Sequence, residues 1–138
     1  MRCRTCFVGA LLLSTSCGGQ LATSTSTSTA ATPDQSFQCV QQQMDALGYR
    51  RSSYDADERR VTGTKIDMKS RRADTQFRRM LDRLQAEVKP QSDGKTSIQV
   101  IAHTFAEYTT QRGPTEVEEK ASSEVRSAAQ DLLERCRS

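Results

Sequence analysis

The chain has 138 residues, of which 35% are hydrophobic, 27% charged and only 5% aromatic, and its mean hydropathy is −0.68. A bilayer crossing needs roughly 20 consecutive apolar residues, and the absence of such a run in the sequence excludes a multi-span membrane protein. Domains usually contain about 100 to 150 residues, so the length predicts one folded domain rather than two.

The first residues have the pattern of an export signal. Arg2 and Arg4 give a basic start, residues 7–13 form a short apolar run, and small residues follow. A basic n-region, a short apolar h-region and small residues at the cleavage site are typical of a secretory signal peptide. We therefore expect residues 1–16 to be removed and the remainder of the chain to be exported.

The junction Leu13-Ser14-Thr15-Ser16-Cys17 resembles the lipobox of bacterial lipoproteins. Small Ser16 directly before the cysteine fits that family, whereas Ser14 stands where the family prefers Leu. In such lipoproteins signal peptidase II cuts before the cysteine, which carries a diacylglyceryl thioether and an acylated amine. The resemblance implies that Cys17 is lipidated and that the protein is held at a membrane of the cell envelope, on its periplasmic side.

A low-complexity segment follows. Residues 22–32 read ATSTSTSTAAT, and Pro33 ends the run. Ser/Thr repeats without apolar alternation bury too little surface to offset the entropy of ordering. We therefore expect residues 17–35 to be a flexible linker, with a reach of about 25 Å for a coil of this length.

Residues 36–138 are expected to form one α+β domain. The first helix has a Cys and four apolar residues on or beside one stripe, a cap at Asp34 or Ser36, and Gly48 as its terminator. A β-hairpin is predicted from residues 49–54 and 59–68, with a bulge near Gly63.

The segment after this hairpin allows two interpretations. Its apolar residues keep helical spacing from Phe77 to Val88, yet residues 84–89 also alternate as in a strand. We expect a helix over 73–82 and a strand over 84–89. If the helix continues to Val88, the sheet has three strands instead of four.

The end of the domain is predicted to contain a strand and a helix. A turn at residues 92–95 leads into a strand over 96–108. Pro114 and the acidic residues after it favour the start of a last helix that continues to Cys136. The expected fold is α+β, with a small antiparallel sheet of three or four strands in two hairpins and with the first and last helices on one face.

Cysteine usage supports an oxidising compartment. Cys3 and Cys6 form a C-x-x-C pair inside the expected signal peptide, so we expect them to be discarded rather than to bind a metal or act in redox chemistry. In the exported chain Cys39 and Cys136 remain beside the anchored Cys17. An even pair in an exported domain predicts a disulfide that links the first helix to the last.

Basic residues are concentrated in the middle of the chain. After removal of Arg2 and Arg4, 18 basic residues face 17 acidic ones, a balance of about +1 that does not indicate a nucleic-acid binder. Residues 50–83, however, contain 11 Lys and Arg against six acids, a difference of +5. Either this is a solvated face, or it is a docking surface for an envelope protein or an anionic polymer. The candidate docking residues are Arg50, Arg51, Arg59, Arg60, Arg71, Arg72, Arg78 and Arg79.

The sequence contains few residues in catalytic patterns. His103 is the single histidine, and we expect it to be a half-buried, hydrogen-bonded strand residue, with a pH-sensitive contact as the alternative. Phosphate-loop, dinucleotide-binding, zinc-protease and serine-hydrolase motifs are absent from the sequence, and no cofactor or metal is expected. The leading hypothesis is a tethered, non-catalytic binding or accessory module. A carrier of a small apolar ligand is the first alternative, and a hydrolase on the same tether is the second.

Overall fold

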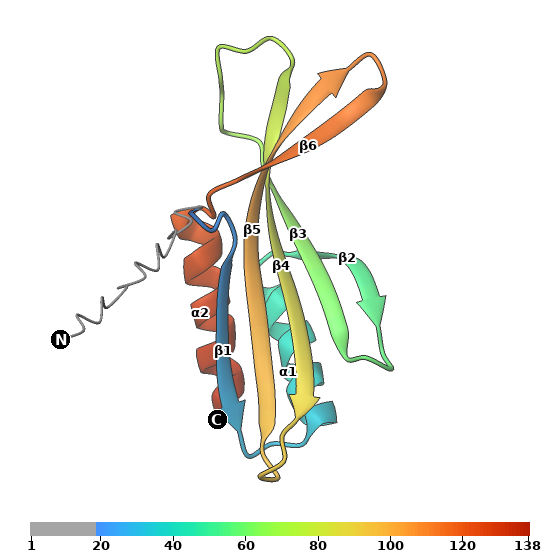
Figure 1. Ribbon diagram of the computed structural model, residues 1–138, viewed down its shortest axis with the longest axis vertical. Helices are drawn as coiled ribbons and strands as arrows, with labels where there is room; N and C mark the ends of the chain where they lie inside the picture. The colour runs from blue at the N-terminus through green and yellow to red at the C-terminus, as the bar shows by residue number, and fades with distance from the viewer. Residues whose placement is uncertain (1–18) are drawn as a thin grey trace, which may run out of the picture.

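The computed structural model describes residues 19–138, so the expected signal peptide and Cys17 lie outside the described residues. The elements in chain order are β1 (Thr23–Thr29), α1 (Pro33–Ala46), β2 (Arg50–Asp55), β3 (Arg60–Asp67), β4 (Phe77–Pro90), β5 (Thr96–Thr110), β6 (Gly113–Glu119) and α2 (Ser123–Arg137). They form an antiparallel six-stranded sheet with two helices (Figure 1). The α+β class with an antiparallel sheet is therefore confirmed, whereas the expected three or four strands were too few.

The long strand β5 organises the sheet. The strand order is β1-β5-β4-β3-β2, and β6 also pairs with β5. One edge of β5 pairs with β4. Its other edge is shared end to end by β1, opposite residues 96–102, and β6, opposite residues 104–110.

Strand β1 corrects the prediction of a flexible linker. Thr23–Thr29 pairs with β5 without a register break, and its threonines face inward while its serines are exposed. β-Branched threonine favours extended backbone, and its methyl group can pack where an apolar residue is expected. The edge of β5 also satisfies the backbone of β1, which the composition of the repeat could not reveal.

Helix α1 lies where it was expected but begins earlier. Thr32 is the N-cap, and its hydroxyl accepts from the backbone N–H of Gln35, whose side chain in turn accepts from the N–H of Thr32. This reciprocal capping box places Pro33 in the first helical turn, where its missing N–H costs nothing. At the other end Gly48 adopts a φ of 86°, as expected of a helix-terminating glycine.

The predicted hairpin is present as β2 and β3. The bulge lies in β2, between Arg51 and Ser53, directly opposite the expected position at Gly63. Gly63 itself permits close packing, because a Cβ atom there would lie 2.9 Å from Cγ of Met44 on α1 and 2.9 Å from Cβ of Tyr49. The sheet and α1 therefore approach each other closely at this point.

Residues 77–82 of the helix expected over 73–82, and the separate strand expected over 84–89, instead belong to the continuous strand β4, and residues 73–76 lie in the loop before it. In β4, Leu84, Ala86 and Val88 are buried within the hydrophobic core, whereas Leu81 is buried outside it, beside Phe105 on the neighbouring strand. Apolar residues on both faces of a strand imitate helical spacing, which accounts for the wrong prediction.

The last helix begins later than predicted. Residues 113–119 form β6, and α2 starts at Ser123 with Ser122 as its N-cap. Pro114 is tolerated because β6 is an edge strand. The acidic residues that suggested a helix N-terminus instead contact the rest of the sheet and its loop: Glu116 pairs with Arg83 of β4, Glu118 with His103 of β5, and Glu119 with Arg72 of the loop before β4.

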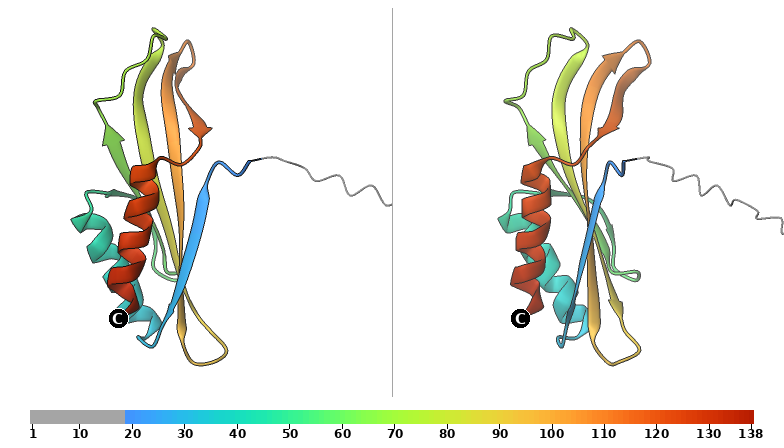
Figure 2. Two further views of the ribbon diagram at one scale, coloured as in Figure 1. Left: turned by 90° about the vertical axis from the view of Figure 1, so that its left-hand side faces the viewer. Right: turned by 60° about the vertical axis from the view of Figure 1, so that its left-hand side comes forward.

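Both helices cover the same face of the sheet (Figure 2). They pack against each other, with α2 over β1 and β5 and α1 over β4. The helix–sheet core includes Val40, Met44, Leu84, Ile98, Val100 and Leu132, none of which is more than 1% exposed. The predicted disulfide between Cys39 and Cys136 is confirmed, with Cα atoms 5.8 Å apart. None of the described helices is both long and apolar enough to cross a membrane.

The sheet continues beyond the helices as a projection that we call the arm, residues 66–81 and 105–119. Figure 1 shows the upper parts of β4, β5 and β6 extending past the helical layer together with the loop that precedes β4. Figure 2 shows this loop on the same side of the sheet as the helices. The arm is therefore a sheet segment that no helix covers.

Replacing both Cys39 and Cys136 with Ser should lower the free energy of unfolding by about 2 to 5 kcal/mol, because the bridge closes a loop with a sequence separation of 97. Chemical denaturation, with reduced wild-type protein as the control, measures the effect. A loss below about 0.5 kcal/mol in both samples would contradict a stabilising role.

Candidate functional site

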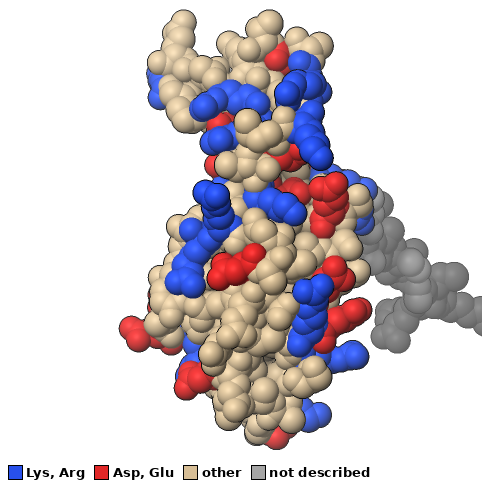
Figure 3. All heavy atoms as spheres, turned by 180° about the vertical axis from the view of Figure 1, so that it is seen from behind, with Lys and Arg blue, Asp and Glu red and all other residues tan. Residues whose placement is uncertain are grey.

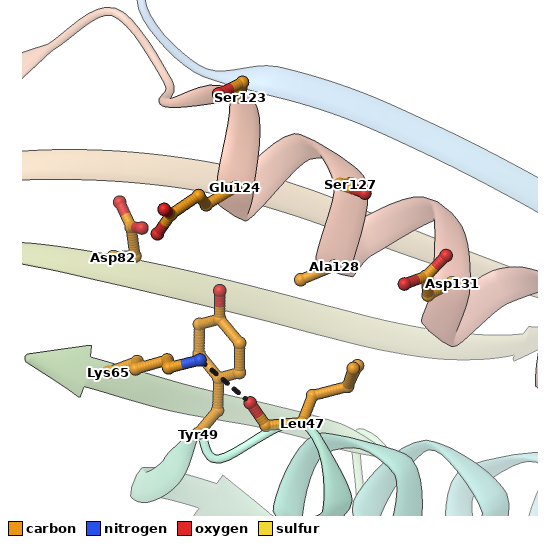
Figure 4. Close-up of a pocket in the computed structure, with 9 residues that line it drawn as sticks. All are labelled: Leu47, Tyr49, Lys65, Asp82, Ser123, Glu124, Ser127, Ala128 and Asp131. Carbon is orange, nitrogen blue, oxygen red and sulfur yellow. Dashed lines mark hydrogen bonds between the residues drawn. The ribbon is translucent and has the colours of Figure 1, made fainter.

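A cleft of about 610 Å³ lies where the helical layer meets the arm, and we call it the waist cleft. Figure 4 shows its lining, which comes from the end of α1, from β3 and β4, and from the first turns of α2. The lining residues are Leu47, Tyr49, Lys65, Asp82, Ser123, Glu124, Ser127, Ala128 and Asp131. Most are polar, and three are carboxylates.

Asp82 fixes the start of α2 at one side of this cleft. Its Oδ1 accepts a 2.6 Å hydrogen bond from the Thr104 hydroxyl, and the Ser122 hydroxyl donates to its Oδ2 over 3.1 Å. Ser122 is in turn the N-cap, accepting from the N–H of Val125, and its own N–H donates to Thr104. A negative charge at a helix N-terminus is favourable. Asp82 therefore supplies a negative charge at the N-terminus of α2 and holds its N-cap residue in place.

Tyr49 forms the floor of the waist cleft. Only 3% of the surface of Tyr49 is exposed, and its hydroxyl points into the cleft (Figure 4). Burial raises the pKa of Tyr49, and the nearby charges of Asp82 and Glu124 raise it further. The phenol is therefore neutral and able both to donate and to accept a hydrogen bond.

Lys65 supplies the positive charge in the lining. Its Nζ donates to the carbonyl of Leu47 over 3.4 Å and lies 5.7 Å from the centre of the Tyr49 ring. A second cleft of about 610 Å³ continues toward residues 66–70 and shares Lys65, Asp82 and Glu124 with the first. The two clefts form one groove beside the arm, and its second half also contains Ile66 and Met68.

The structure separates the arginine doublets into distinct regions. Arg50 and Arg51 begin β2, Arg59 and Arg60 lie at the turn into β3, and the remaining four belong to the arm or its loop. Figure 3, viewed from the helix side, shows basic side chains spread from the arm to the lower part of the domain, with acidic side chains between them. The eight arginines are not gathered into one surface.

Five of these eight arginines form ion pairs within the chain. Arg59 pairs with Asp34, Arg60 with Glu87 and Glu58, Arg72 with Glu119, and both Arg78 and Arg79 with Glu107. Of the others, Arg51 donates to Gln41, and Arg71 donates to backbone carbonyls of its own loop. Most of this positive charge is therefore neutralised locally.

His103 lies on the face of the sheet opposite the helices, half-buried as expected. Its Nδ1 is 2.6 Å from Oε1 of Glu118 on β6, and its ring stacks on Phe105. Arg83 also lies over Phe105, 4.5 Å from the centre of its ring, and pairs with Glu116. These contacts tie β6 to the sheet and give His103 a structural environment.

Arg72 holds the loop that precedes β4 against the arm, on the face of the sheet that the helices cover lower down. Its two terminal nitrogens each lie 2.6 Å from an oxygen of Glu119, and one also donates to the Tyr108 hydroxyl. Its guanidinium stacks 5.1 Å from the centre of the Phe77 ring. The hydrogen bonds from Arg72 lower the pKa of Glu119, although partial burial acts in the opposite direction.

Sequence reasoning missed Tyr49, Asp82 and Glu124. A signal for Asp82 was present, because it alternates with the core residues Leu84, Ala86 and Val88, and a charged residue on the core-facing side of a strand needs specific partners. The signal became visible only once residues 77–82 were known to be a strand. Among residues 19–138, no three His, Cys, Asp or Glu side chains are placed to hold a metal ion.

Replacing Asp82 with Asn should destabilise the domain by about 1 to 3 kcal/mol, because an amide nitrogen cannot accept the Ser122 or Thr104 proton and the charge at the α2 N-terminus is lost. Denaturation of D82N and of D131N, which changes an exposed carboxylate of the same cleft, provides the comparison. Equal effects in the two variants would contradict the capping role.

Replacing Glu119 with Gln should remove a pH-dependent contribution of about 1 kcal/mol. Because the folded-state pKa of Glu119 is lowered, its contribution is present above its ordinary pKa of 4.5 and is lost as the pH falls through the folded value. Unfolding measured from neutral pH down to acid should show the difference between wild type and E119Q shrinking below 4.5, with E134Q as the control. A difference that does not depend on pH would contradict the assignment.

No protein-family model matches this chain, and a comparison with curated proteins finds no relative. The function is therefore inferred from the geometry of the domain and from the residues themselves.

Proposed function

We propose that the protein is a lipid-tethered, non-catalytic binding module of the cell envelope that engages an envelope protein through the arm. The observation that carries the proposal is that the arm extends beyond the helices and presents exposed apolar side chains. The anchor at Cys17 and the export signal are the parts of the proposal taken from the sequence.

The position of β1 makes the proposed tether short. The backbone N–H of Ala121 already donates to the carbonyl of Leu21 over 2.8 Å, so only residues 18–20 separate this fixed point from Cys17. Fully extended, this stretch reaches about 14 Å at roughly 3.3 to 3.6 Å per residue. A lipid on Cys17 would therefore hold the start of β1 and the first turn of α2 close to the membrane surface.

The arm has the features of a protein-binding surface. Of the five large hydrophobic residues that are exposed among those described, three belong to the arm: Ile66 at 45%, Met68 at 64% and Val117 at 50%. Ile66 and Met68 line the same two clefts together with Lys65, whereas Val117 lies on β6 at the opposite face of the arm. Exposed apolar side chains rimmed by polar residues, such as Ile66 and Met68, are typical of interaction sites. The pairing of most doublet arginines with carboxylates makes a protein partner a better fit than an anionic polymer.

Two experiments in the native host or in a bacterial host test the proposal: photocrosslinking tests the docking surface, and membrane fractionation tests the lipid anchor. A crosslinking amino acid at Ile66 or Met68 should give a discrete protein adduct in the membrane fraction. The same residue at Tyr54, which is exposed at 48% but lies outside the arm, should not. Replacing Cys17 with Ser should release the protein from the membrane fraction.

Adducts that are the same at Tyr54 and at the arm, or the absence of adducts at the arm, would contradict the docking surface. A C17S protein that stays in the membrane fraction would contradict the lipid anchor. The two results are independent, so either part can fail alone.

A further inference from the structure

The waist cleft contains a hydroxyl group without a protein partner, at the tip of a buried side chain. Only 3% of Tyr49 is exposed, and no hydrogen bond among the residues drawn in Figure 4 reaches its hydroxyl. The hydroxyl oxygen itself is not enclosed, because it points into the open cleft beside Asp82 and Glu124. It is therefore available to a hydrogen-bonding group from outside the domain.

The carboxylates around this hydroxyl lack a cation. Within residues 19–138, neither Asp82 nor Glu124 forms an ion pair, and the partners of Asp82 are the neutral hydroxyls of Thr104 and Ser122. Lys65 binds the carbonyl of Leu47 instead of a carboxylate. With Asp131 also in the lining, three carboxylates face one ammonium, so the cleft carries a net negative charge.

The free hydrogen-bond acceptor sites on the carboxylates fit an ammonium group better than a guanidinium or a metal ion. Each oxygen of Asp82 already accepts one hydrogen bond, Oδ1 from Thr104 and Oδ2 from Ser122, so each keeps one acceptor site. An ammonium donates three separate hydrogen bonds in different directions, so a single ammonium can bind Asp82, Glu124 and the Tyr49 oxygen together, whereas a planar guanidinium fork fits one carboxylate. A divalent metal would need more oxygen ligands than these side chains place together.

We propose that the waist cleft binds a primary alkylammonium group through the carboxylates of Asp82 and Glu124 and the hydroxyl oxygen of Tyr49. The group belongs either to a lysine side chain of a partner protein or to a free polyamine. The site lies beside Ile66 and Met68, which line the neighbouring cleft, but it binds through other side chains, so it extends the proposed function and its test does not depend on it.

NMR titration of the purified, disulfide-bonded protein tests the site. The probes are Nα-acetyl-lysine amide and spermidine, and the control is the lysine amide acetylated also on its ε-nitrogen, which has no charge. The amide resonances of Tyr49 and Ala128 should shift saturably with a charged probe and remain unchanged with the acetylated control. Saturation with the lysine amide identifies a lysine side chain as the source, and saturation with spermidine alone identifies a polyamine.

Variants assign the site to the named atoms. Y49F and E124Q should each weaken binding at least about fivefold, as expected for the loss of one hydrogen bond to a charged group. The matched variant E134Q changes a carboxylate on α2 outside the cleft and should bind like wild type. K65Q should bind as tightly as wild type or more tightly, because it removes a repelling charge.

Three results would overturn the proposal: no saturable shift with either charged probe, equal effects of E124Q and E134Q, or loss of binding in K65Q. Y49F and E124Q change an unpaired hydroxyl and an exposed carboxylate, so their folding can be verified from unchanged spectra. D82N is not needed for the test, because its effect on α2 would obscure the result.

Discussion

The antiparallel pairing of β4 with β5 is the constraint on which the rest of the structure depends. These strands have 14 and 15 residues and stay in contact from Phe77 and Tyr108 to Pro90 and Thr96. At their lower half the alternate side chains form the floor of the helix–sheet core. At their upper half the same ladder continues without helices, so that backbone pairing, ion pairs and the Arg72 contacts hold the arm together.

The network of Asp82, Thr104 and Ser122 lies at the boundary between these halves. It replaces apolar packing with hydrogen bonds at the level where α2 begins, and so sets the end of the helical layer. The same arrangement leaves the Tyr49 hydroxyl beneath two carboxylates. The site and the boundary of the core therefore have one physical origin, which is a charged residue on the inward face of β4.

The sequence supplied the parts of the fold that local patterns control. The stripe of α1, the hairpin of β2 and β3, the strand β5 and the pairing of Cys39 with Cys136 were all predictable from spacing and composition. The strand β1 was not, because its partner β5 lies far away in the chain. The strand β6 was not, because Pro114 and the acidic residues after it have the pattern of a helix N-terminus, and the first half of β4 was not, because both of its faces carry apolar residues. The candidate site was missed for the same reason: Tyr49, Asp82 and Glu124 come together only when β4 is continuous and α2 starts at Ser123.

The first and last segments of the domain depend on each other. β1 pairs with β5 and packs against α2, and Cys39 is joined to Cys136, so these contacts link the N-terminal part of the domain to its C-terminal half. Contacts of such long sequence separation form late in folding, after the loops between them have closed. A growing chain can therefore pair β1 only after β5 has been made, and it has a complete helical layer only once α2 has been made. No N-terminal fragment that lacks α2 contains the whole core.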